Sequence, residues 1–355
     1  MSQKPALSRR TVLVILLVTI NVVLVVGGYS LIWWILAGDL AAEGEVWTER
    51  RRADGFDVSY QSKSVGGFPF DIEIVFDAPR FGRAEPNEAW VWEGEQLTLV
   101  VPPWRLDRPV LRLDGLQRFR FGAGRAYREV NVEARSLGAK LFVGSLGQLE
   151  RLALGARDVR AAGSAFDGVL TVARVRLEGS RDWRAAGPTA VSISVLVNSA
   201  TLPRDTSGLG TLVTRVRVDA TVRGDPLPAV GLAPGLAVWR DDGGTIEFRT
   251  FAVEWGSLDV DAEGTIALDA AMRPVGAGSA TVAGHEATID RLVAAGNLGE
   301  SDGATAKAIL DVIARLSSVD GQRARVPLRI QDGDVFLGPI AVAKVGPVVA
   351  PSRAP

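Results

Sequence analysis

Residues 215–223 read RVRVDATVR, and this stretch decides the fold class. Val216, Val218, Ala220 and Val222 take every second position, with charged or polar residues between them. Successive side chains of a β-strand point to opposite faces of the sheet, whereas a helical face repeats every 3.6 residues. The period of two therefore predicts a strand with one apolar face and one face in water.

The same alternation recurs along the chain. Further strands are expected at residues 72–76, 97–101, 191–197, 245–254, 257–263, 265–269, 276–282, 326–330 and 335–337. Gly, Pro or Asp-Gly separates most of them, as short antiparallel connections require. Helical periodicity is strong only at 286–295 and 304–316, with a weaker candidate at 146–154. Because helices do not alternate with strands, a parallel α/β sheet is disfavoured.

We therefore predict a mainly β protein of antiparallel sheets, with a few helices near the C-terminus and one N-terminal transmembrane helix. The sheets form either an open curved sheet or a sandwich. The pattern leaves both arrangements open.

Residues 11–37 carry no charged side chain, and 17 of these 27 residues are Leu, Ile or Val. A helix of this length crosses a hydrocarbon core of about 30 Å. Lys4, Arg9 and Arg10 precede the run, so the positive-inside rule predicts a cytoplasmic N-terminus. The expected organisation is a cytoplasmic tip (1–10), a transmembrane anchor (11–37), a juxtamembrane segment (38–55) and a periplasmic β-rich region (56–355). The expected location is the bacterial inner membrane, crossed once.

A cleaved signal peptide is the competing interpretation of this run. Its apolar region would span roughly 7–15 residues and end in small residues at positions −3 and −1 of the cleavage site. The run here is longer, and Ile35 and Leu40 place large residues at the −3 positions of the two candidate sites. The sequence favours an anchor that is not cleaved.

Composition excludes several classes of chemistry. The chain has no cysteine, which excludes disulfides, zinc–thiolate sites, iron–sulfur clusters and cysteine nucleophiles. Its single histidine, His285, excludes cages of several histidines and is expected to be a capping or surface residue. The net charge of −1 argues against a nucleic-acid-binding protein.

One motif copies the opening of a calcium-binding loop. Asp259, Asp261 and Glu263 alternate before Gly264, which holds the sixth position of such a loop. The twelfth position is Ala270, where a bidentate glutamate should close the site. We interpret the acidic residues as the wet face of a hairpin that turns at Gly264. No other constellation reaches the threshold of a catalytic, cofactor or metal site, so a non-catalytic protein is expected.

Three short motifs carry a family resemblance. Gly67-Phe68-Pro69-Phe70 leads into an alternating strand, and Trp255-Gly256 precedes another. Asp332-Gly333 and Gly338-Pro339 flank the last apolar strand. In order and spacing they resemble an uncharacterised, mostly alphaproteobacterial family (domain of unknown function 2125), over residues 65–340. More distantly, the chain is similar to AsmA-type inner-membrane-anchored periplasmic proteins, which are implicated in envelope assembly and phospholipid traffic.

The family carries no established catalytic residues, so the resemblance assigns none here. The local reading of the motifs is structural. Pro69 removes a backbone donor and marks a sheet edge or a strand entrance. Phe68 and Phe70, on either side of Pro69, are expected to share one side of the strand. Trp255-Gly256 and Gly338-Pro339 are expected to form strand-end packing and turns.

The functional expectation is a non-catalytic, membrane-anchored periplasmic protein that maintains the envelope through an apolar β groove accommodating lipid. The alternative is a tethered scaffold or interaction protein with a closed β core and no lipid. The expected partners are the inner membrane, through residues 11–37, and phospholipid or another envelope protein, but no nucleic acid and no cofactor.

Overall fold

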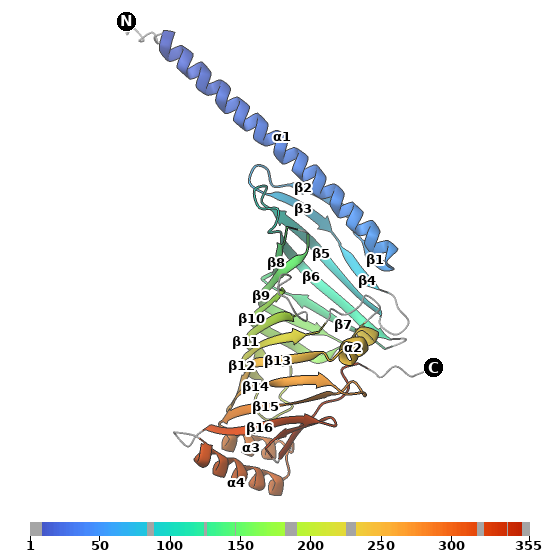
Figure 1. The fold of residues 1–355 in the computed structure, drawn as a ribbon, viewed down its shortest axis with the longest axis vertical. Coiled ribbons are helices and arrows are strands. Elements are labelled where there is room, and N and C mark those ends of the chain that lie inside the picture. The colour runs from blue at the N-terminus through green and yellow to red at the C-terminus, as the bar shows by residue number, and fades with distance from the viewer. Residues whose placement is uncertain are drawn as a thin grey trace.

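The structure is a computed structural model that describes residues 9–83, 89–123, 126–145, 147–181, 190–224, 232–317, 323–338 and 340–349. Within these residues all strands belong to one antiparallel sheet of 18 strands. Helix α1 (Arg9–Ala53) lies across one end of the sheet, and α3 (His285–Ala294) and α4 (Glu300–Ser317) lie at the other end (Figure 1). The remaining helix, α2 (Leu232–Asp241), connects two strands in the middle of the chain.

The strands follow one another along the sheet almost in chain order. They are β1 (Phe56–Ser59), β2 (Ser62–Gly66), β3 (Ile72–Asp77), β4 (Arg80–Arg83), β5 (Ala89–Val101), β6 (Val110–Ala123), β7 (Ala126–Glu133), β8 (Ser136–Val143), β9 (Leu149–Gly163), β10 (Phe166–Arg181), β11 (Ala190–Thr201), β12 (Leu212–Arg223), β13 (Thr245–Trp255), β14 (Leu258–Leu268), β15 (Pro274–Ala283), β16 (Arg323–Gln331), β17 (Asp334–Leu337) and β18 (Ile340–Lys344). From β9 onward each strand pairs with the next.

Near the N-terminal end of the sheet, two short strands can occupy the place of one long strand. β1 pairs with β4 and β2 pairs with β3, so the four strands form one long interrupted hairpin. β7 and β8 both lie between β6 and β9. The result is a long twisted sheet rather than two packed layers, as Figure 1 shows. The prediction of a mainly β, antiparallel protein is confirmed, and of the two arrangements left open, the described residues form the open sheet.

Several local predictions were wrong. β14 runs through Gly264 without turning, because Gly264 keeps ladder partners on both sides, Phe248 in β13 and Gly278 in β15. The weak helix at 146–154 is absent: residues 149–154 begin β9, and Leu146 lies outside the described residues. The helices are only partly near the C-terminus, because α2 precedes β13. Its first turn contains Pro234 and Gly235, which have low helix propensity, so the sequence pattern did not predict this helix.

Helices cover the sheet at both of its ends. At the N-terminal end, Trp33 and Ala37 of α1 are buried against Ile72 and Ile74 of β3. At the C-terminal end, α3 and α4 pack on β14, β15 and β16; this cluster comprises Ala262, Ala280, Val282, Ile289, Ala306, Leu310, Ala314, Ala324 and Val326. Two compact cores therefore lie at the ends under helices. A third cluster, of Val172, Ala200 and Val213, lies in the central strands β10 to β12 and contains no helix residue.

Candidate functional site: one apolar face of the sheet

The register aligns apolar side chains of twelve strands into continuous rows, which together we call the apolar face. The first row comprises Ile74, Leu99, Leu111, Ala139, Leu154, Leu177, Val195, Val218, Phe251, Ala262, Ala280 and Val326, each directly opposite the next. The second comprises Phe76, Leu97, Leu113, Leu137, Ala156, Val175, Val197, Val216, Val253, Val260, Val282 and Ala324. No polar residue interrupts either row.

The opposite face is polar in the same strands. Glu178, Ser194, Asp219 and Thr250 form a row of direct cross-strand neighbours there. The Ser194 hydroxyl donates to Asp219 at 2.7 Å, and Arg217 donates to the same carboxylate at 2.8 Å. The hydrogen bond from Ser194, and to a smaller extent that from Arg217, lowers the pKa of Asp219 below its usual value. This face is built to remain charged in water.

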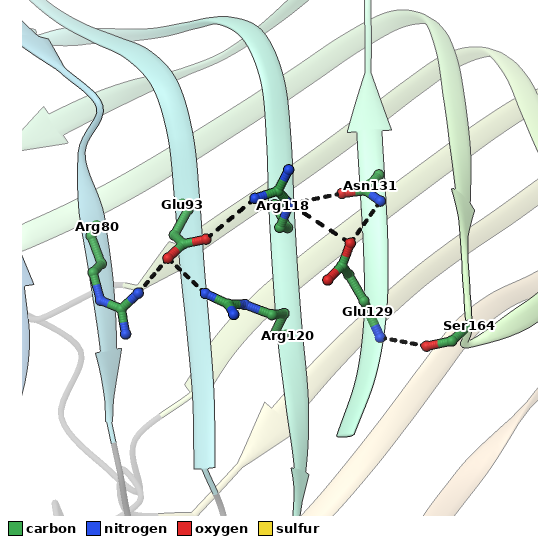
Figure 2. A network of polar contacts seen from close by, with 7 residues as sticks. All are labelled: Arg80, Glu93, Arg118, Arg120, Glu129, Asn131 and Ser164. Carbon is green, nitrogen blue, oxygen red and sulfur yellow. Dashed lines mark hydrogen bonds and ion pairs between the residues drawn. The ribbon is translucent and has the colours of Figure 1, made fainter. Parts of the chain in front are cut away.

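A branched polar network continues this face near the N-terminal end (Figure 2). Glu93 on β5 accepts hydrogen bonds from Arg80 and, at 2.7 Å, from Arg120. Arg118 lies 3.8 Å from Glu93 and 3.7 Å from Glu129, and thereby links β5 to β7. Phe81, the neighbour of Arg80 in β4, contacts Trp47 of α1. Because neighbouring residues of a strand point oppositely, the network lies on the side of the sheet away from α1.

The apolar face is covered at its ends and open in its middle. Ile74, under α1, and Val326, under α4, each have 1% of their surface exposed. Phe251, in the same row on the central β13, is 41% exposed. The first-row residues of β9 to β12 between them are half-buried, whereas Ala156 in the second row is buried. An uncovered apolar surface of this extent is characteristic of a binding surface for an apolar partner.

A hollow of about 250 Å³ lies in the sheet across β13 to β17, next to the cluster under α3 and α4. Its lining comprises Phe248, Phe251, Ala262, Glu263, Gly264, Thr265, Ile266, Gly276, Ala277, Leu328, Ile330 and Val335. Gly264 and Gly276 leave its floor without side chains. Sequence reasoning missed this glycine patch, although the spacing of Gly276 and Gly278, two apart on one strand face, was a usable signal.

The Gly67-Phe68-Pro69-Phe70 motif forms the turn between β2 and β3 and leads into β3, which begins at Ile72. Gly67 has a φ of 92°, and its carbonyl accepts a hydrogen bond from the Asp71 amide, which closes the turn. A Cβ at Gly67 would lie 2.5 Å from the Asp71 carbonyl oxygen, so glycine is required. The placement of Phe68 and Phe70 on one side of a strand was therefore wrong.

The other described motif residues lie at a strand end or in tight turns. Trp255 donates a hydrogen bond to the Gly210 carbonyl at 2.7 Å, and Gly256 turns the chain into β14 with a φ of 58°. Asp332 and Gly333, with φ of 55° and 86°, join β16 to β17. Gly338 has a φ of 60° and follows β17. Pro339 lies outside the described residues.

Arg273 connects the turn between β16 and β17 to the turn between β14 and β15. The Arg273 side chain donates to the Asp332 carbonyl at 3.1 Å and to Asp269 at 2.8 Å. Hydrogen bonds from Arg273, its backbone amide first, lower the pKa of Asp269. The motif residues are thus spread along the molecule and do not meet in one pocket.

The acidic and histidine candidates are partnered. Asp259 and Glu263 lie on the polar face of β14, opposite Arg323 and Arg325 at 3.3 and 2.9 Å. The expected wet face is confirmed, although the hairpin is not. His285 is buried at the start of α3, with Nε2 2.9 Å from Asp311, so its expected surface position was wrong.

Within the described residues, one group has the composition of a metal site. The candidate ligand atoms of His285, Glu286 and Asp311 lie within 4.8 Å of one another. Nε2 of His285, on α3, is already hydrogen-bonded to Asp311 on α4.

These features define a class: a protein of one long antiparallel sheet with a continuous apolar face, preceded by an apolar helix. Among the described helices, α1 alone is long and apolar enough to cross a membrane. The chain belongs to the family DUF2125, described as an uncharacterized protein conserved in bacteria, whose model matches residues 33–346. No curated protein and no solved structure matches the chain. The likeness to AsmA-type proteins and the alphaproteobacterial origin therefore stay predictions.

Proposed function

We propose that this protein is a membrane-anchored carrier of lipid, whose apolar face accommodates acyl chains and thereby serves maintenance of the bacterial envelope. The observation that carries the proposal is the pair of apolar rows running without a polar interruption over twelve strands. Acyl chains are the common ligands that need an apolar surface and no specific polar partner.

The dimensions of the apolar face suit lipid. Neighbouring strands lie about 4.8 Å apart, so the seven row strands outside the helix-covered clusters, β6 and β8 to β13, extend over roughly 30 Å. One acyl chain spans about half of a 30 Å hydrocarbon core, or about 15 Å. The uncovered part of the apolar face therefore has room for about two acyl chains in succession, and the hollow beside Gly264 adjoins it.

The contacts of α1 support an anchor rather than a cleaved signal. Trp33 and Ala37 have 7% and 3% of their surfaces exposed because they pack on Ile72 and Ile74. Cleavage after Ala37 would remove these residues and expose both isoleucines to water. By the positive-inside rule, Arg9 and Arg10 before the run support our proposal that the N-terminus lies in the cytoplasm and the sheet in the periplasm, with α1 in the inner membrane.

The proposal includes no catalytic step, no cofactor and no nucleic-acid partner. Titratable side chains of the central strands lie on the polar face, where they pair across strands, as Arg223 does with Glu247. The apolar face offers acyl chains dispersion contacts and exclusion of water, but no acid, base or nucleophile in its two rows.

Photocrosslinking in cells tests the lipid. A photoreactive amino acid replaces Val218, on the apolar face of β12, and in a matched control it replaces Arg217, the neighbour on the polar face. Mass spectrometry of the full chain should find phospholipid adducts at position 218 and none at 217. If positions 195, 218 and 251 all give protein adducts or none, the lipid proposal is wrong and the tethered scaffold replaces it.

A further inference from the structure

The turn between β2 and β3 is held against α1 at the far end of the apolar run. The Tyr29 hydroxyl donates a hydrogen bond to the Pro69 carbonyl, and the Trp33 indole donates to the Asp71 carbonyl at 3.0 Å. The Phe68 ring lies 5.5 Å from that of Trp33 in an edge-on arrangement. This turn, residues 67–71, is called the aromatic loop below.

The aromatic loop exposes its own apolar side chains. Phe68 is 52% exposed and Phe70 is 70% exposed, unlike the isoleucines that follow in β3. On the neighbouring helix, Ile32 and Trp34 are 57% and 74% exposed. Helix and loop therefore present neighbouring apolar side chains to their surroundings.

The position of Tyr29 along α1 fixes the level of the aromatic loop. Tyr29 lies 19 residues after Arg10, the last cation before the apolar run. At 1.5 Å per residue this is about 28 Å along the helix, close to the hydrocarbon thickness of about 30 Å. If Arg10 lies at one surface of the bilayer, Tyr29 and Trp33 lie at the opposite interface, where aromatic side chains are favoured.

We propose that the aromatic loop is a second membrane contact, with Phe68 and Phe70 inserted among the lipids at the periplasmic interface. This inference rests on the proposed anchor, because only a spanning α1 brings the loop to that level. The occupant of the exposed surface is the bilayer itself. The contact holds the first strands of the sheet against the membrane, at the end of the apolar face nearest to lipid.

The absence of cysteine in the chain makes a clean test possible. Phe70→Cys in the full chain is labelled with an environment-sensitive fluorophore and reconstituted into vesicles of phosphatidylethanolamine and phosphatidylglycerol. Leu24→Cys, in the apolar run, reports on the anchor. Val312→Cys, 55% exposed on α4 at the far end of the molecule, is the control in water.

We expect nitroxide lipids labelled near the glycerol end of the acyl chain to quench the probe at position 70 several-fold more than the probe at 312. Iodide in the buffer should show the reverse order. Quenching at 24 but not at 70 would overturn the aromatic-loop contact and leave the anchor intact. Absence of quenching at 24 would refute the anchor and the loop contact together. Shielding of 70 from both quenchers would show that protein, not lipid, covers the loop.

Discussion

Trp33 joins α1 to the sheet through three interactions. Its indole donates to the Asp71 carbonyl, its ring packs edge-on against Phe68, and its body is buried on Ile72 and Ile74. Trp34, the next residue, is 74% exposed and faces away. The side chain that connects helix and sheet and the side chain that the helix exposes are therefore adjacent in the sequence.

The first prediction concerns this pair. Trp33→Ala should destabilise the β1–β5 end of the sheet by about 3–5 kcal/mol, because a large buried ring and a hydrogen bond are lost together. Trp34→Ala should leave the free energy of unfolding nearly unchanged. Thermal unfolding of the full chain in detergent measures both. Equal shifts for the two variants would contradict the described packing of α1.

At the scale of elements, the pairing of β14 with β15 depends on glycine. Gly264 is directly opposite Gly278, and Gly276 is opposite Ile266. A Cβ at Gly278 would lie 2.0 Å from the Glu263 carbonyl oxygen, which is backbone and cannot swing aside. Glycine here permits close approach of two strands and also forms the floor of the hollow.

The second prediction compares two glycines of the apolar face. Gly278→Ala should cost about 1–3 kcal/mol, as overpacking does, because the strands must separate. Gly179→Ala in β10 meets nothing within 4 Å and should be neutral or slightly stabilising. Denaturant unfolding of both variants gives the comparison. A stable Gly278→Ala variant would contradict the close approach.

At the scale of the whole molecule, the sheet is fixed to one end of a helix 45 residues long. The apolar half of α1 projects beyond the sheet, and the half that follows packs along β1 and β3 (Figure 1). If the apolar half spans the membrane, the entire sheet lies on the other side from Arg9.

The third prediction is the resulting topology. In intact cells, a protease should not reach the sheet until the outer membrane is permeabilised, and then it should digest the sheet while leaving an N-terminal tag protected. Before protease is added, the tag should be found on the full-length chain if α1 is an anchor that is not cleaved. Loss of the tag would show that α1 is a signal sequence, and protection of the sheet in spheroplasts would contradict export.

The amino-acid sequence by itself determined the apolar helix and the two faces of individual strands. Alternation such as that of Val216, Val218 and Val222 is a local property, because backbone geometry alone sends successive side chains to opposite sides. The general β class and the α3 and α4 helices followed from the same local patterns.

Only the tertiary structure decided how those faces combine. Phe248 and Phe251 differ in parity, so simple alternation places them on opposite faces; a register shift in β13 brings both to the apolar face, with their rings 6.4 Å apart. Likewise, the passage of β14 through Gly264 and the contact of Tyr29 with Pro69 join residues that no local pattern connects. Register depends on bulges, turns and partners distant in the chain, and a shift of one residue exchanges the two faces of a strand. The continuous apolar face is therefore a property of the assembled sheet.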